Sequence, residues 1–225
     1  MNVIRFAGPA ALTFAILASP ATAQTKAGPE PPKPRVSEAT KQKAAEQGAN
    51  PEALVLADFQ KRIDAYMTIH KEAAKDAPPL KETKNPAEIK AAQDALGATI
   101  RAARAMAKQG DIVTPELQNK FRRLMYPVVA GPAQKGTAER EVQADVKEEL
   151  KENTEERKEE SGKPVVLKVN ATYPPDTPLP TTPPQILMNL PKLPEQLEYR
   201  IIGKNLIIRD VDANIIVDFV PNAIQ

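Results

Sequence analysis

The fold is decided by the stretch Leu190-Pro-Lys-Leu-Pro-Glu-Gln-Leu-Glu-Tyr-Arg-Ile-Ile-Gly-Lys-Asn-Leu-Ile-Ile-Arg-Asp-Val-Asp-Ala-Asn-Ile-Ile-Val-Asp-Phe-Val220. It holds the densest β-branched and aromatic content of the chain, interrupted by turn residues, which predicts a small antiparallel β-meander. Leu197, Tyr199 and Ile201 alternate with polar residues, as in a half-buried strand. Gly203-Lys204 predicts a two-residue hairpin turn with Gly at its first central position.

The rest of the meander needs a cover, because three short strands are near the lower limit of independent stability. We expect the inner face to continue through Leu206 and Ile208, a turn at Asp210–Ala213, and a third strand with Ile215, Val217 and Phe219. The candidate covers are a strand at Val165–Val169 and a helical turn within Gln185–Leu190. Between them, the proline-rich segment Tyr173–Pro184 should be polyproline II.

Three helix starts with the same pattern precede this C-terminal half, at Asn50-Pro51-Glu52, Asn85-Pro86-Ala87-Glu88 and Thr114-Pro115-Glu116. Each supplies a capping side chain, a proline at the first helical position and a glutamate in the first helical turn. Apolar residues follow at spacings of three and four: Val55, Phe59, Ile63, Tyr66, Met67 and His70; Ile89, Ala92, Leu96, Ile100, Ala103 and Ala107; Leu117, Phe121, Leu124 and Met125. These stripes predict a helical hairpin with a third helix lying across it.

We expect these three helices to end at about Lys75, at Gly110 and before Pro127, which defines a helical module at 50–127. A charged helical connector should follow at 128–163. Its helix, Thr137–Ser161, has only a thin apolar stripe of Val142, Val146 and Leu150. Beyond Leu150 it is polar on every side, so it should project or fray, held by the ion pairs Glu148–Lys151 and Glu155–Lys158.

The N-terminus reads as an export signal. Arg5, the apolar run Ala10–Ala18 and the small residues Ala21-Thr22-Ala23 predict a signal peptide at 1–23, cleaved after Ala23, and a periplasmic or secreted protein. The proline-rich stretch 24–49 should be a flexible linker. No later stretch reaches the ~20 apolar residues of a membrane span.

Composition excludes several classes of function. The chain has no cysteine and no tryptophan, 23 prolines and 4% aromatic residues. Disulfide frameworks and thiolate sites are therefore excluded, and we expect small modules separated by extended segments. The formal charge of +2 gives no steering toward nucleic acid or anionic membrane. Nucleophile-elbow, P-loop and dinucleotide motifs do not occur, so we expect no catalytic residue and no cofactor.

His70 is the only histidine, which excludes a multi-histidine zinc site. It is most simply a boundary residue favoured by the C-terminal end of a helix dipole. A sharper hypothesis places it in a ligand-binding polar site with Tyr66 and with Arg101 or Arg104 of the neighbouring helix. A third has it binding a metal with Glu72 or Asp76.

Arg101 and Arg104, with Arg122 and Arg123, form the arginine concentration of the helical module. As structural residues they would be a solvated face whose aliphatic stems cover the core. As functional residues they could dock an anion such as phosphate or a carboxylate-bearing polymer.

The carboxylates of the meander, Asp210, Asp212 and Asp218, superficially suggest a calcium site, and Asp210, Asp212 and Asn214 lie at alternate positions, as at the start of an EF-hand loop. The sixth position is Ile215 rather than Gly, and no Glu stands at the twelfth. Turn chemistry explains these residues equally well, so we expect no metal site.

A resemblance adds to this reading. Its residues are Phe59-x3-Ile63-x2-Tyr66-x3-His70, Ile100-x3-Arg104-x5-Gly110-Asp111 and Leu193-Pro-x2-Leu197-Glu-Tyr-Arg-x2-Gly203-x2-Leu206-x2-Arg209-Asp-Val-x-Ala-Asn214-x2-Val217-Asp-Phe. Over most of 52–220 the chain resembles a group of uncharacterised exported bacterial proteins, and no activity comes with that resemblance. The terminal meander is distantly similar to the tail of small periplasmic proteins of the RcnB nickel/cobalt-homeostasis type.

The sequence therefore predicts an α+β protein with a helical module, a charged connector and, at 164–225, a proline-rich segment and β-meander. The predicted function is a non-catalytic, exported cell-envelope interaction or scaffold protein with a protein or polymer partner. The alternative is a small-anion binding protein or enzyme that uses Tyr66, His70, Arg101 and Arg104.

Overall fold

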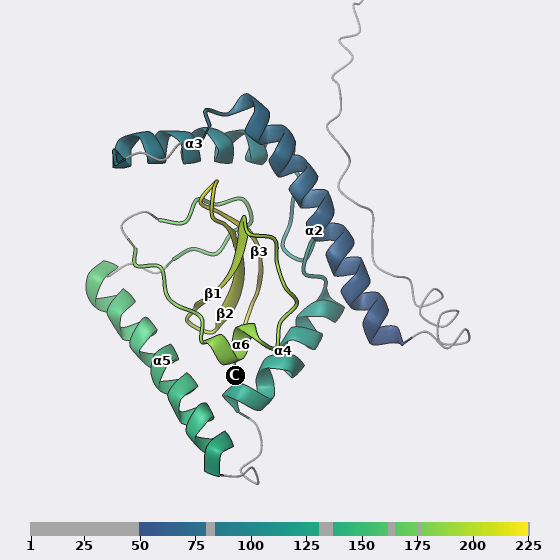
Figure 1. The fold of residues 1–225 in the computed structure, drawn as a ribbon, viewed down its shortest axis with the longest axis vertical. Helices are drawn as coiled ribbons and strands as arrows, with labels where there is room; N and C mark the ends of the chain where they lie inside the picture. Colours follow the sequence, from purple (N-terminus) through teal and green to yellow (C-terminus); the bar gives the residue numbers. More distant parts are fainter. Residues whose placement is uncertain (1–49, 80–83, 131–136, 162–164, 175–176, 225) are drawn as a thin grey trace, which may run out of the picture.

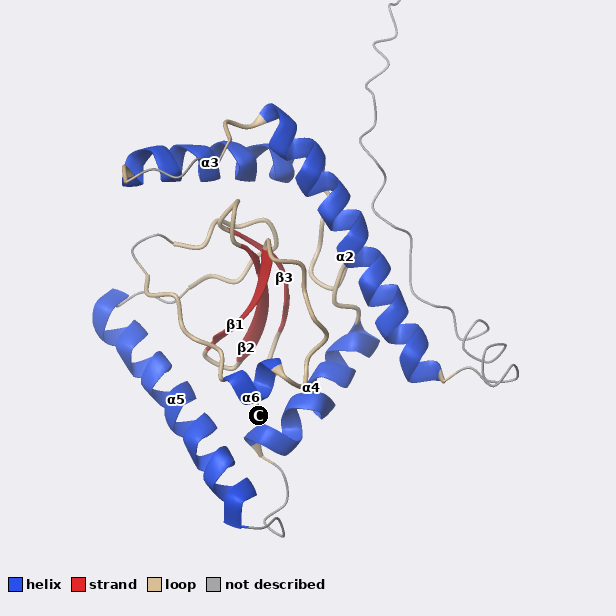
Figure 2. Ribbon diagram, viewed as in Figure 1, coloured by secondary structure: helices blue, strands red, loops and turns tan. Residues whose placement is uncertain are grey.

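A computed structural model describes residues 50–79, 84–130, 137–161, 165–174 and 177–224, without the side chains of 137–139 and 157–161. The predicted signal peptide and linker lie outside these residues. The fold is α+β, as predicted: helices surround a small C-terminal antiparallel sheet (Figure 1). Figure 2 shows the strands at the centre, with α3 across one end, α2 and α4 along one side and α5 on the other.

The three predicted helix starts are confirmed. The helices are α2 (Pro51–Asp76), α3 (Pro86–Ala103) and α4 (Pro115–Val129). Each begins after a side chain that accepts a backbone N–H: Asn50 from Glu52, Asn85 from Ala87 and Thr114 from Leu117. Because these caps involve only local contacts, the sequence alone was enough to locate them.

Helix α3 ends earlier than predicted. It stops at Ala103, which is exposed, rather than continuing through Ala107 to Gly110. The reason is a reciprocal contact with Asn170, whose amide donates to the Arg104 carbonyl (2.8 Å) and accepts from the Arg104 guanidinium (2.9 Å). That contact binds the free carbonyl end of the helix and buries Arg104.

Helix α4 ends later than predicted, because Pro127 lies inside it and Val129 forms its last residue. A proline inside a helix removes one backbone hydrogen bond. Here Met125 and Val129 are both buried in the core, and Ala130 N–H closes the last turn on the Tyr126 carbonyl (2.9 Å). Burial of the final turn outweighs the lost bond.

The meander is confirmed, with β1 (Leu197–Ile202), β2 (Asn205–Asp210) and β3 (Ile215–Val220) in the order β1-β2-β3. Gly203 has φ of +60° in the first hairpin turn, as its predicted position requires. The prediction for Phe219 was wrong. Between β2 and β3 the register shifts at Ile208/Arg209, so that Asp218 pairs with Ile208 and Ile216 pairs with Arg209.

This β-bulge at Val217 inverts the side-chain alternation of the last residues of β3. Phe219 packs on the outer face of the sheet, and Asp218 is buried on the helix-facing side. The inner face joins α2, α3, α4 and α5 in one apolar core. The outer face carries a smaller cluster of Tyr173, Ile202, Ile207 and Ile216.

The outer cluster is covered by the chain around 165–179, through Val165, Leu167 and Leu179. The prediction of a strand at Val165–Val169 was wrong. Val166 is 77% exposed and Asn170 turns the chain with φ of 64°. Pairing with β3 therefore begins only at Asn170, whose N–H donates to the Ile216 carbonyl, and includes the isolated bridge Thr172–Ile215. The short helix α6 (Pro184–Leu187) places Ile186 in the inner core, as expected for a cover.

Helix α5 (Thr137–Ser161) confirms the predicted bounds. In its described part it is docked on the fold rather than projecting. Val146 is buried, and Asn153 bonds the hydroxyl of Thr181 at 3.1 Å. An ion pair joins Lys151 and Glu155 at 3.8 Å instead of Lys151 and Glu148. The side chain of Lys158 lies outside the described residues.

Across the described ranges, none of the helices combines the length and the apolar character needed to span a membrane.

Candidate functional site

The candidate site is centred on Asp210, the last residue of β2, whose side chain is fully buried. Its Oδ2 accepts the Tyr66 hydroxyl at 2.6 Å and lies 2.7 Å from Nδ1 of His70. Its Oδ1 accepts the backbone N–H of Ala213 at 2.8 Å. One carboxylate therefore joins helix α2 to the turn between β2 and β3.

Local structure explains how these groups meet. Tyr66 and His70 are four residues apart, so they lie one above the other on the buried face of α2. Asp210 begins the β2–β3 turn, where an aspartate commonly accepts the N–H of a following residue. The predicted stripe of α2 located Tyr66 and His70. The partner that joins them was missed, because Asp210 had been read only as a turn or calcium residue.

Burial and this carboxylate shift both pKa values. The hydrogen bond to Asp210 raises the pKa of His70 from 6.5, against the opposing effect of burial. Burial, then the Asp210 charge, raise the pKa of Tyr66 well above its usual value, so Tyr66 stays a neutral donor. The hydrogen bond between His70 and the Asp210 carboxylate is therefore strongest when the imidazole of His70 is protonated and carries a positive charge.

Asp212 faces the outer edge of the network. Its Oδ2 lies 3.5 Å from Nε2 of His70, and its side chain is 36% exposed. Burial, then the charge of Asp210, raise the pKa of this carboxyl. In a catalytic triad a nucleophile would occupy this position. Here the carboxylate of Asp212 occupies that position, so His70 lies between two carboxylates.

Of the two predicted arginines, the structure brings Arg104 to the network but not Arg101. The Arg104 guanidinium lies 4.9 Å from the centre of the Tyr66 ring, a cation–π distance, and also donates to the Val217 carbonyl at 3.2 Å. Burial lowers the pKa of Arg104. Arg101 instead donates to the hydroxyl of Thr172 at 3.1 Å.

The expected solvated arginine face is therefore wrong for Arg104, which is buried, and right for Arg123, which is exposed. Arg122 is half-buried and donates to the carbonyl of Pro221 (2.7 Å).

A second buried carboxylate, Asp218, was also missed. It accepts the backbone N–H groups of Gly110, Ile112 and Val113 at 2.8–3.0 Å. Burial raises the pKa of Asp218, and these backbone hydrogen bonds oppose the shift. The residue ties the α3–α4 loop to the sheet. Sequence periodicity placed its side chain outward because the bulge at Val217 leaves no local signal.

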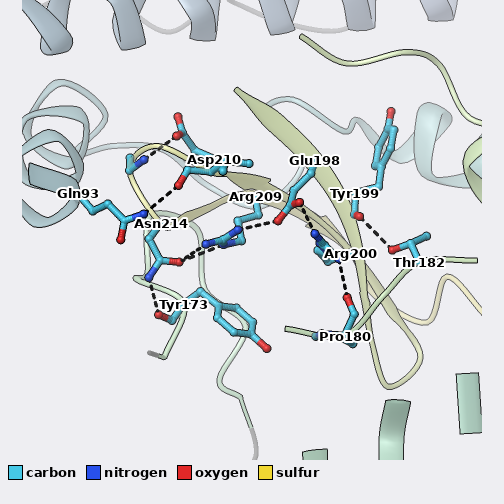
Figure 3. Close-up of polar contacts among 12 residues, drawn as sticks. Gln93, Tyr173, Pro180, Thr182, Glu198, Tyr199, Arg200, Arg209, Asp210 and Asn214 are labelled. Carbon is cyan, nitrogen blue, oxygen red and sulfur yellow. Dashed lines mark hydrogen bonds and ion pairs between the residues drawn. The ribbon is translucent and has the colours of Figure 1, made fainter. Parts of the chain in front are cut away.

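The residues of the EF-hand-like pattern contact two different partners: Asp210 and Asp212 lie at opposite nitrogens of His70, and Asn214 bonds Arg209. Asp210 faces α2, Asp212 lies near the imidazole edge, and Asn214 Oδ1 accepts the Arg209 side chain at 2.8 and 3.0 Å (Figure 3). Such divergence is turn chemistry rather than a set of ligands around one ion.

An open groove lies elsewhere, along β1. Its volume is about 560 Å³, within the range of ligand pockets. Its walls combine apolar or aromatic residues with an equal number of polar or charged ones: Leu187, Pro191, Leu193, Leu197 and Tyr199, and Thr181, Thr182, Lys192, Glu198 and Arg200. A smaller hollow of about 150 Å³ lies between α4 and the C-terminal residues Ala223 and Ile224.

No family model, curated protein or solved structure matches this chain. The function must therefore be argued from the geometry.

Proposed function

We propose that this protein is a non-catalytic, exported interaction or scaffold protein of the cell envelope, which binds its partner through the groove along β1. Export rests on the signal-like residues 1–23. The observation that carries the binding role is the contrast between two regions: the reactive side chains are bonded internally, while the groove presents apolar walls to solvent.

The internal bonding argues against direct chemistry. Asp210 accepts from Tyr66, His70 and Ala213, and the Arg104 guanidinium bonds Asn170 and Val217. A ligand could use these groups only by displacing contacts that tie helices to the sheet, which leaves buried polar atoms unpaired.

The alternative, a small-anion site, has one observation in its favour. Tyr66, His70 and Arg104 do converge, as a polar site would require. Arg101 lies apart from them, bonded to Thr172, so the predicted four-residue set is not assembled.

Capture of partners from intact envelope separates these functions. We expect the wild type to capture a partner, and Leu187→Asn, in the groove wall, to capture at least about tenfold less, since lost apolar burial and a buried amide together amount to about 1.4 kcal/mol. Met188→Asn is the matched control, because Met188 directly follows the end of α6 and is exposed but does not line the groove.

The opposite result would be equal capture by wild type and Leu187→Asn, together with a rise of Tm in sodium phosphate that disappears in His70→Asn. That outcome would establish the anion site and overturn the interaction role.

A further inference from the structure

Strand β1 is an edge strand whose outer side is incompletely paired. The Val211 N–H bonds the Gln196 carbonyl, so the hydrogen-bonded pairs with β2 are 196/211, 198/209, 200/207 and 202/205. In an antiparallel pair the alternate residues direct their N–H and C=O groups to the other side. Leu197, Tyr199 and Ile201 therefore present backbone groups to the outer edge.

Two of these groups have partners. The Leu197 N–H donates to the Pro194 carbonyl, and the Tyr199 carbonyl accepts the Thr182 hydroxyl at 3.0 Å (Figure 3). The N–H groups of Tyr199 and Ile201 have no acceptor among the described residues. The neighbouring chain is rich in proline, which has no N–H and cannot complete a ladder. It contacts this edge at two points, through the Thr182 hydroxyl and the Pro180 carbonyl, and forms no backbone pair with it among the described residues.

At the opposite edge of the sheet, strand β3 has backbone hydrogen bonds to a neighbouring segment of the chain. Along β3, Asn170 and Tyr173 donate to the carbonyls of Ile216 and Asn214, and Ala171 accepts from Ile216. Backbone pairing thus protects β3, whereas β1 borders the groove of about 560 Å³. An unpaired edge beside an apolar groove is the geometry in which an extended peptide adds to a sheet.

The charges of the groove specify the peptide. Its one lining carboxylate, Glu198, is shared by Arg200 (2.5 Å) and Arg209 (2.6 Å). Although burial would raise the pKa of Glu198, hydrogen bonds from these arginines lower it, so Glu198 remains ionised and paired. Lys192 is exposed on the wall and has no ion-pair partner among the described residues. The groove therefore has an excess of positive charge.

Arg200 adds a polar group that needs an acceptor. One terminal nitrogen bonds Glu198 and the other the Pro180 carbonyl, while its Nε is buried without a partner (Figure 3). A buried donor left unpaired is unfavourable, because it has given up its hydrogen bond to water without gaining another. An acceptor on an incoming ligand, reached by a small shift of this side chain, would remove that cost.

We propose that the groove binds an extended, acidic peptide segment of a partner protein, which adds along β1 as a fourth strand. This inference rests on the proposed interaction function and names the chemistry of its partner. A peptide carbonyl accepts from the Tyr199 N–H, alternate apolar side chains contact Leu187 and Leu193, and a carboxylate pairs with Lys192.

The test uses three labelled six-residue peptides with blocked ends and fluorescence anisotropy on the purified protein. In the first Glu and Val alternate, in the second Lys replaces Glu, and the third is the first with alternate backbone nitrogens methylated. We expect the Glu peptide to bind at least about tenfold more tightly than the other two, a difference of about 1.4 kcal/mol.

Lys192→Glu should reverse the preference between the Glu and Lys peptides. Lys204→Glu, the same charge change in the exposed β1–β2 turn outside the groove wall, should leave it unchanged. Equal binding of the Glu and Lys peptides, undiminished binding of the methylated peptide, or the same effect from both variants would overturn the proposal. If envelope capture still depends on Leu187 in that case, the interaction function stands and only the fourth-strand chemistry fails.

Discussion

Asp210 shows how one side chain can hold distant parts of this chain together. Its carboxylate accepts from Tyr66 and His70, 144 and 140 residues earlier in the sequence, and from the N–H of Ala213 in its own turn. Since the side chain is fully buried, water cannot replace a lost contact.

Replacing Asp210 by Asn should therefore be costly. Asp210→Asn removes the charge that pairs with His70 and puts an amide where three donors converge, so we expect a loss of about 2–4 kcal/mol in the free energy of unfolding. Urea denaturation followed by circular dichroism measures it. Asp212→Asn, two residues away and partly exposed, is the control and should change stability by less than about 0.5 kcal/mol. Equal losses of stability in the two variants would show that Asp210 is not the residue that holds α2 to the β2–β3 turn.

The raised pKa of His70 makes stability depend on pH. A group whose pKa is higher in the folded than in the unfolded state stabilises the fold fully below the unfolded value, here 6.5, and loses that contribution as pH rises through the folded value. We expect the free energy of unfolding to fall as pH rises above 6.5. Measured in the Asp212→Asn background, where the neighbouring carboxyl cannot titrate, the slope should disappear in His70→Gln. A slope that persists would assign the titration to another group.

Among the elements, α3 packs closely against the β2–β3 turn at Gly97. A Cβ at Gly97 would lie 2.9 Å from the Ala213 carbonyl oxygen and 3.3 Å from Cγ2 of Ile215. Gln93 of the same helix donates to the Val211 carbonyl. Helix α3 is therefore seated directly on the turn that also carries Asp210.

This contact reverses the ordinary preference for alanine in a helix. Gly97→Ala should destabilise the protein by about 1–3 kcal/mol, because the new methyl group meets a backbone oxygen that cannot move alone. Next to it, on the exposed side, Ala98→Gly should cost the usual ~1 kcal/mol. Thermal unfolding of both variants measures the contrast. A stabilised Gly97→Ala variant would mean that α3 does not lie this close to the turn.

Elements determined by local signals were predictable from the sequence, and those determined by distant contacts were not. The caps at Asn50, Asn85 and Thr114 and the turn at Gly203 need only neighbouring residues. The burial of Arg104 depends on contacts from elsewhere in the chain.

The same distinction applies to the candidate site. Helical spacing identified Tyr66 and His70, but Asp210 joins them only after the sheet docks on α2. Asp218 could not have been recognised by alternation, because the bulge at Val217 turns it inward. Arg101 and Arg104 looked equivalent in sequence, and only their distant contacts distinguish them: Arg104 meets Asn170, Val217 and Tyr66, whereas Arg101 meets Thr172.

At the scale of the whole molecule, the inner face of the sheet and helices α2 to α5 share one apolar core. The helices thus bury their apolar stripes against the C-terminal sheet as well as against each other. We expect unfolding to be a single transition: the intrinsic fluorescence of the four tyrosines, and far-ultraviolet circular dichroism, should change at the same urea concentration. Two separated midpoints would show that the helices form an independent unit.

The measurement that tests the central claim most directly is site-specific photocrosslinking in intact cells, with a photoreactive amino acid at Leu187 in the groove wall or at Lys71, exposed beside His70. If the β1 groove binds the partner and the His70 network is structural, position 187 gives a discrete crosslinked protein and position 71 gives none. Crosslinking from position 71 alone would contradict this account.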